Sequence, residues 1–124
     1  MQTHEQVLSR KVYDAIVKVE AFDYAKKYGR VCLRFPVLLH RNGLAQTLAF
    51  FQAKGAGENH PQFGVFLNDL ASVVGVPDWS MIHTIDTAEY LRLTRSAHRA
   101  GDWFKRYAEA ILKVDPAEEN DDRG

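Results

Sequence analysis

The side chains best suited to chemistry in this sequence are five cations on one face of a helix predicted over residues 86–114. At about 100° per residue, they fall within about 60° of one another, opposite an apolar strip that would face a protein core. They are Arg92, Arg95, Arg99, Arg106 and Lys113. Because guanidinium groups bind phosphate oxygens in bidentate fashion whichever base is attached, such a row suits the backbone of a nucleic acid. The four arginines are therefore the first candidates for RNA contact.

A solvated helix face with local ion pairs is the alternative explanation of this row. Asp102 and Arg106 are four residues apart, as are Glu109 and Lys113, and opposite charges pair at this spacing on a helix. Such pairs would occupy Arg106 and Lys113. The other three arginines would stay unpaired within the helix and available to a ligand.

A second group of cations surrounds the first expected helix–helix turn. It consists of Lys26, Lys27, Arg30, Arg34 and Arg41. A helix predicted over residues 3–28, ending at Gly29, would place both lysines in its last turn, where the helix dipole favours cations. Capping therefore explains the lysines without a ligand, and the group is a secondary candidate for RNA binding.

Four other side chains have types that could contact RNA but positions that favour a structural role. Trp103 and Tyr90 could stack on bases, yet each lies at the edge of the apolar strip, where an aromatic side chain usually packs against a neighbouring helix. Gln46 and Thr47 lie beside positions expected to be buried. Packing or a local hydrogen bond is the common reason for polar residues there, so we assign all four to structure.

No catalytic or metal-binding motif accompanies the cations. The sequence has no nucleophile elbow, no phosphate-binding glycine loop and no pair of cysteines, and no two of its five histidines stand three or four residues apart, as a local zinc-binding pair would. The enzymatic alternative is a small helical ribonuclease of the HEPN type, with histidine as general base and arginine stabilising the phosphorane. Arg34 and His40, and Arg92 and His98, have the required spacing. We predict a protein that is not an enzyme and that has no metal and no cofactor.

Length and charge predict one folded domain followed by a tail. A chain of 124 residues is enough for a single core, and its 46% hydrophobic and 26% charged residues are typical of globular domains. Residues 115–124 hold five acids and one base, whereas residues 1–114 hold 15 bases and 11 acids. We therefore divide the chain into a mildly basic domain, 1–114, and an acidic, disordered tail, 115–124. The tail would keep the protein soluble; as a mimic of phosphate, it would instead compete for the arginines.

The cysteine content and the hydropathy pattern predict a cytoplasmic protein. Cys32 is the only cysteine, which excludes an internal disulfide and suggests a reducing compartment. No uninterrupted apolar run approaches the roughly 18 residues of a membrane span. The N-terminus lacks the apolar core of a signal peptide.

Apolar periodicity predicts an all-α fold, a compact bundle of five or six helices in a single domain. The expected helices cover about 3–28, a segment within 30–41 that begins or kinks at Pro36, 44–54, 62–74, 79–84 and 86–114. Asn42-Gly43 is interpreted as a tight turn that needs positive φ, and Gly55 to Pro61 as a flexible linker. Asp86 and Glu89 are expected to form a capping box at the start of the last helix.

Two blocks of the chain resemble one known family. The first is RFPVLLHRNGLAQTLAF at 34–50, followed by Lys54, and the second is YLRLTRSA at 90–97, followed by WFKRYAE at 103–109. Together and in this order they resemble the small helical subunit of type III-B CRISPR effector complexes, the fifth member of the Cmr module. That family shows Asn-Gly-Leu, Gln-Thr-Leu-Ala-Phe and a lysine, and later Thr-Arg and a Trp-x-Lys-Arg-x-Ala block.

The resemblance implies a non-catalytic subunit of an antiviral complex. Members of this family resemble compact helical bundles. Several copies stack in a filament beside larger subunits and line the path of target RNA paired with guide RNA. The implied partners are other Cmr subunits, copies of the chain itself, and guide and target RNA, with no membrane and no small-molecule substrate. Because base pairing already determines the sequence, the protein needs to recognise only shape and charge. Lys54 matches the family's lysine and joins the RNA-binding candidates. The alternatives are the HEPN-like ribonuclease and a helical adaptor that binds only protein.

Overall fold

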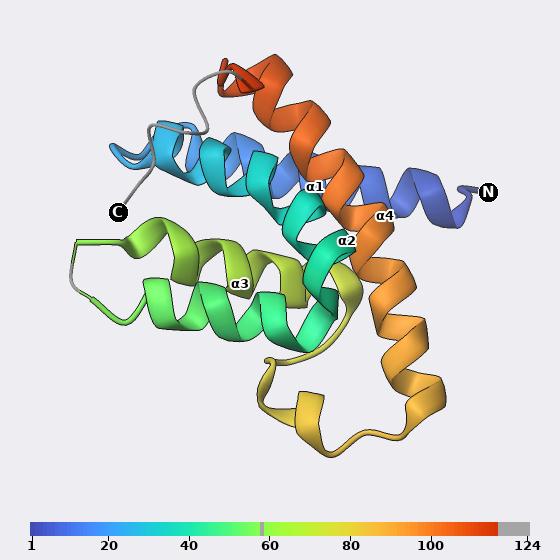
Figure 1. Cartoon of the computed structure of the whole chain (residues 1–124). Helices are drawn as coiled ribbons and strands as arrows, with labels where there is room; N and C mark the ends of the chain where they lie inside the picture. Colours follow the sequence, from blue (N-terminus) through green and yellow to red (C-terminus); the bar gives the residue numbers. More distant parts are fainter. Residues whose placement is uncertain (58, 117–124) are drawn as a thin grey trace.

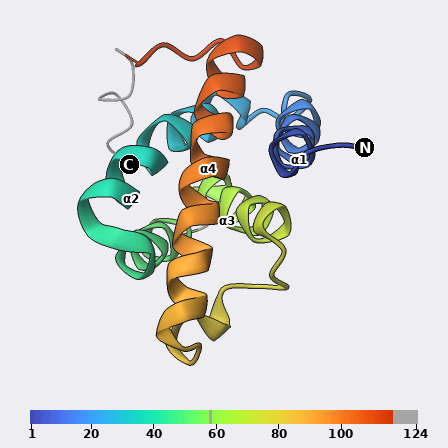
Figure 2. The same cartoon turned by 90° about the vertical axis from the view of Figure 1, so that its right-hand side faces the viewer.

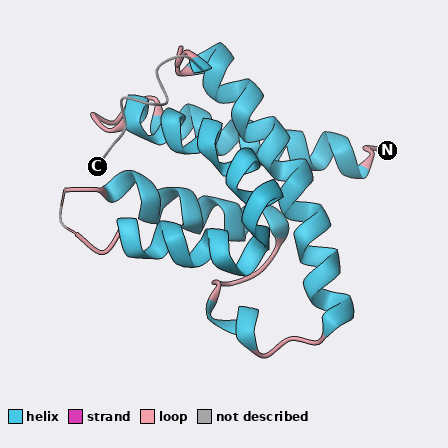
Figure 3. Cartoon of the chain, viewed as in Figure 1, coloured by secondary structure: helices cyan, strands magenta, loops and turns pink. Residues whose placement is uncertain are grey.

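The computed structural model describes residues 1–57 and 59–116, and this part of the chain is helical without a strand (Figure 3). Its elements are α1 (His4–Val19), α2 (Ala25–Lys54), α3 (Pro61–Val74), the short 3₁₀ helix η1 (Ser80–His83) and α4 (Thr87–Ile111). The all-α prediction is confirmed, with four α-helices where five or six were expected. Of the predicted acidic tail, residues 117–124 lie outside the described residues.

The first helix is shorter than predicted. Thr3 and Gln6 form a capping box, in which the Gln6 amide donates to Thr3 Oγ1 at 3.0 Å and the Thr3 amide to Gln6 Oε1 at 2.7 Å. α1 then ends at Val19 and α2 begins at Ala25, so the prediction of one helix over 3–28 was wrong. Phe22, inside the range predicted to be helical, is 49% exposed in the turn between them. The chain reverses here because the apolar side chains after the turn pack as part of α2.

Gly29 does not end a helix, which was the second error in this region. It is buried inside α2, and a Cβ at this position would lie 2.7 Å from Val114 Cγ1. The lack of a side chain on Gly29 therefore leaves room for Val114, in the segment that follows α4. Lys26 and Lys27 consequently stand in the first turn of α2, where the helix dipole opposes cations. The capping explanation of these lysines fails.

A break at Gly43 divides α2 into two arms (Figure 2). Gly43 has φ 81° and ψ 170°, which confirms the predicted turn with positive φ. Two side chains satisfy polar backbone groups at the break: the Tyr90 hydroxyl accepts from the Ala45 amide at 3.0 Å, and Thr47 Oγ1 donates to the Gly43 carbonyl at 2.8 Å. The helix passes through Pro36 rather than beginning there.

The core lies where α4 crosses α2 and α3, and α3 runs beside the second arm of α2 (Figure 1). Phe66 of α3 is fully buried, with its ring centroid 5.1 Å from that of Phe35 and 5.0 Å from that of Phe104. α1 packs on α4 and α3. This arrangement buries the apolar strip of α4 and leaves its basic face outside.

A polar contact at the edge of the core joins α2 to α3. The Tyr28 hydroxyl donates to Asp69 Oδ2 at 2.7 Å. Burial raises the pKa of Asp69 above its ordinary value, although the hydrogen bond from Tyr28 acts in the opposite direction. Burial also raises the pKa of the Tyr28 hydroxyl well above its ordinary range.

Candidate nucleic-acid interface

α4 presents four of the five predicted cations on one exposed face. Arg92, Arg95, Arg99 and Arg106 all lie on this helix and are exposed. Lys113, the fifth, does not belong to the row because α4 ends at Ile111. It has a φ of 60°, and its carbonyl accepts a hydrogen bond from Lys26 Nζ at 3.0 Å.

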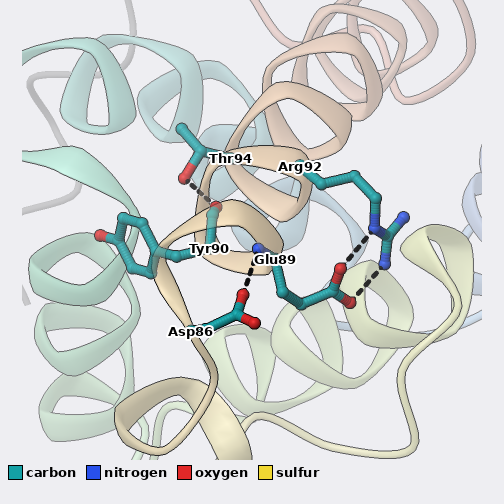
Figure 4. Close-up of polar contacts among 5 residues, drawn as sticks. All are labelled: Asp86, Glu89, Tyr90, Arg92 and Thr94. Carbon is teal, nitrogen blue, oxygen red and sulfur yellow. Dashed lines mark hydrogen bonds and ion pairs between the residues drawn. The ribbon is translucent and has the colours of Figure 1, made fainter.

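Arg92 is not unpaired, contrary to the prediction (Figure 4). Its Nε and Nη2 donate to the two carboxylate oxygens of Glu89, each at 2.7 Å. These hydrogen bonds raise the pKa of Arg92 and lower that of Glu89. The expected capping box is therefore half formed: Asp86 accepts from the Glu89 amide at 2.9 Å, while the Glu89 side chain binds Arg92.

The remaining arginines of α4 are available to a ligand. In the described part of the chain, neither Asp102 with Arg106 nor Glu109 with Lys113 forms the expected ion pair. Arg95, Arg99 and Arg106 likewise have no carboxylate partner among residues 1–57 and 59–116. Within those ranges, the row thus retains three unpaired guanidinium groups.

α2 is the more strongly cationic helix. It contains six cations and no carboxylate, whereas α4 contains five cations and three carboxylates. The cations of α2 are Lys26, Lys27, Arg30, Arg34, Arg41 and Lys54. The first five lie within about 100° of one another around the first arm. The secondary group of candidates therefore forms a stripe along one helix, interrupted between Arg34 and Arg41 by the exposed Val37, rather than a cluster around a turn.

The bend at Gly43 brings the last cation of α2 back toward the stripe. Arg34 Cζ and Lys54 Nζ each lie 5.5 Å from the ring centroid of Phe50, so the two cations are separated by no more than twice that distance. Phe50 is 36% exposed, and sequence reasoning missed it. Its spacing of four residues from Lys54 was a usable signal, but its contact with Arg34 depends on the bend. Two cations beside an exposed ring are suited to phosphate groups.

Two members of the stripe are less suited to test ligand binding. Lys26 holds the segment after α4 through the Lys113 carbonyl. Arg30 is half-buried, and its Nε has no hydrogen-bond partner among the described residues. Lys27 and Arg41 are exposed and have no ion pair within the described ranges, so they are the better probes of ligand binding.

Three of the four side chains that we assigned to structure form hydrogen bonds within the chain, whereas Gln46 is exposed. Trp103 Nε1 donates to Glu5 Oε1 at 2.8 Å, which joins α4 to α1. Tyr90 and Thr47 form hydrogen bonds with backbone groups at the break at Gly43.

The structure places the two Arg/His pairs of the ribonuclease alternative on single helices. Arg92 and His98 both lie on α4, where the Arg92 guanidinium is held by Glu89. Arg34 and His40 both lie on α2. Within the described residues, no group of three or more histidine, cysteine, aspartate or glutamate side chains is placed to hold a metal ion.

Comparison with known proteins identifies the family. The family model described as CRISPR-associated protein (Cas_Cmr5) matches residues 4–111. The chain belongs to the Cmr5 family. A Cmr5 protein of Thermus thermophilus, named CRISPR system Cmr subunit Cmr5, is 35% identical over an alignment of 117 residues that covers 91% of this chain and 99% of that protein. The resemblance seen in the two sequence blocks is confirmed over nearly the whole chain.

The Cmr5 fold is shared as well. The crystal structure of a CRISPR-associated Cmr5 family protein from Thermus thermophilus matches with a TM-score of 0.80 and 33% identity, covering 90% of this chain and 99% of that one. The helix arrangement described above is therefore that of a Cmr5 protein. In the part of the chain that the structure describes, no helix has both the length and the apolarity to cross a membrane.

Proposed function

We propose that this chain is a non-catalytic subunit of a CRISPR Cmr ribonucleoprotein complex and that it contacts the backbone of guide-paired target RNA. Its relative in Thermus thermophilus is named a Cmr subunit, which supports the assignment to the complex. Its partners are then other Cmr subunits, further copies of itself stacked in a filament, and the two RNA strands. It acts in the cytoplasm, where the buried Cys32 stays reduced.

The observation that carries the RNA contact is the composition of α2. Six cations with no carboxylate in 30 residues give a local field that a phosphate backbone would neutralise, releasing counterions. Arg34 and Lys54 converge on Phe50, which extends the stripe across the bend. Arg95, Arg99 and Arg106 of α4 form a second row. Neither row needs to contact bases, because pairing with the guide selects the target.

RNA binding measured at several salt concentrations tests the proposal. With guide-paired RNA as the ligand, each phosphate contact contributes about 0.9 to the slope of log affinity against log salt, the value for a duplex. Replacing Lys27 and Arg41 by glutamine should therefore reduce the magnitude of the slope by about 1.8. A matched control, Arg10→Gln with Lys18→Gln, removes the same charge from exposed positions on α1.

The same titration compares the contributions of α2 and α4 to RNA binding. Arg95→Gln with Arg106→Gln should reduce the slope by a similar amount if α4 also lies along the RNA. An equal fall in affinity for the α1 control would show that only the total charge matters and would refute a defined interface. RNA cut by the purified protein, with cutting lost on His98→Ala or His40→Ala, would refute the non-catalytic assignment.

A further inference from the structure

A pocket of about 340 Å³ lies between the first half of α1, the end of α3 and the start of α4. Val7 and Leu8 of α1 and Val73 and Val74 of α3 give it an apolar part. Its polar lining includes Gln2, His4, Glu5, Lys11, Arg92 and Arg99. Two arginines of the α4 row thus border a concave site rather than an open helix face.

The charges at this pocket favour an anion. Three cations line it against a single carboxylate, that of Glu5. One oxygen of that carboxylate already accepts a hydrogen bond from Trp103 Nε1 at 2.8 Å. Lys11 and Arg99 have no ion pair among the residues the structure describes.

We propose that this pocket binds one phosphate group, with Lys11 and Arg99 as its principal ligands. The two cations come from different helices, so they can approach a phosphate from two sides. His4 and Ser96 line the same pocket, and an imidazole N–H and a hydroxyl both donate hydrogen bonds. Arg92 also lines the pocket, but its guanidinium is held by Glu89. The inference rests on the proposed function only for the source of the phosphate, which is either an RNA backbone or a free nucleotide.

The two tryptophans allow the pocket to be observed directly in the full chain. The indole N–H of Trp103 donates a hydrogen bond to Glu5, a residue that lines the pocket. The indole N–H of Trp79 donates to the Leu67 carbonyl at 2.9 Å, and neither of these two residues lines the pocket. In a ¹H–¹⁵N spectrum, phosphate binding should therefore shift the Trp103 indole signal in a saturable way and leave that of Trp79 unchanged. The probes are inorganic phosphate, AMP and a single-stranded RNA oligonucleotide.

Two substitutions and one control decide the assignment. Lys11→Gln and Arg99→Gln should each weaken the binding that moves the Trp103 signal by about tenfold, since each removes a charge-assisted hydrogen bond. Lys105→Gln removes the same charge from α4 at an exposed position outside both the lining and the arginine row, and should leave this binding within about twofold. The proposal is overturned if no probe moves the Trp103 signal, or if Lys105→Gln weakens binding as much as Arg99→Gln.

The probes also separate this inference from the proposed function. Saturation by RNA at a concentration at least tenfold lower than by AMP identifies a backbone phosphate, whereas equal affinities identify a free phosphate group; either result supports the pocket. Pocket binding without any RNA affinity would refute the proposed function alone. Salt-dependent RNA binding that is lost on replacing Lys27 and Arg41 but unaffected by Lys11→Gln and Arg99→Gln would refute the pocket alone.

Discussion

The crossing of α2 and α4 determines where both basic helices stand, and Gly101 at this crossing provides a sharp test. A Cβ on Gly101 would lie 3.0 Å from Phe35 Cδ2 and 3.1 Å from Phe35 Cε2. The Phe35 ring has little room to yield, because it is fully buried and its centroid lies 5.1 Å from that of Phe66 and 6.1 Å from that of Phe51. Gly101→Ala gains up to about 1 kcal/mol of helix propensity but overpacks the crossing, at a cost of about 1–3 kcal/mol. We expect a net loss of about 1 kcal/mol in the free energy of unfolding.

The matched control is Gly64→Ala in α3, where an added Cβ meets nothing within 4 Å. This substitution should stabilise the protein by about 0.5–1 kcal/mol through helix propensity alone. Urea unfolding followed by far-UV circular dichroism measures both values, and the two variants should shift the midpoint in opposite directions. Equal stabilisation by both alanines would show that the crossing is not closely packed, and the positions argued for the basic helices would lose their support.

Three further results are expected. Tyr90→Phe leaves the Ala45 amide at the break of α2 without its acceptor and should lower the free energy of unfolding by about 1–2 kcal/mol in the same urea assay; an unchanged midpoint would contradict this. Burial raises the folded-state pKa of Asp69, so its stabilising contribution is fully present below the ordinary value of 3.8 and is lost as pH rises through the raised pKa. Asp69→Asn should flatten that part of the stability profile while keeping an acceptor for Tyr28. Glu89→Gln releases the guanidinium that Glu89 now holds and should raise RNA affinity at low salt by about threefold, with no gain expected if this arginine lies away from RNA.

The fold was predictable where a local signal and the tertiary structure agree. Gly43 needs a positive φ in any arrangement that turns the chain there, and α4 has one continuous apolar strip. The boundary between α1 and α2 was not predictable in this way. Gly29 has the appearance of a helix stop, but its function depends on Val114, a residue 85 positions away in the sequence that packs against it. No local sequence rule distinguishes a glycine that ends a helix from one that leaves room for a side chain distant in the sequence.

In the candidate site, too, the features set by local sequence were predictable and those set by tertiary packing were not. The cations themselves were all identifiable from the sequence, and the absence of carboxylates between Ala25 and Lys54 is visible in it. What could not be predicted was how they combine. Glu89 satisfies the spacing rule for a capping box and also that for an ion pair with Arg92, and only the side-chain geometry shows that the ion pair forms. Lys11 was overlooked because its proximity to Arg99 results from the packing of α1 against α4.

A formal net charge of zero for the whole chain does not oppose binding to a polyanion. At physiological ionic strength the Debye length is about 8 Å, so a phosphate beside α2 is attracted mainly by the cations of that helix and is largely screened from carboxylates further away. The relevant quantity is therefore the local charge, six cations without a carboxylate on α2. If copies of the chain stack side by side, each presents the same stripe to one RNA, and the modest attraction of a single copy is multiplied because later contacts form at high effective concentration. A neutral chain can in this way bind RNA weakly as an isolated subunit and firmly within an assembly.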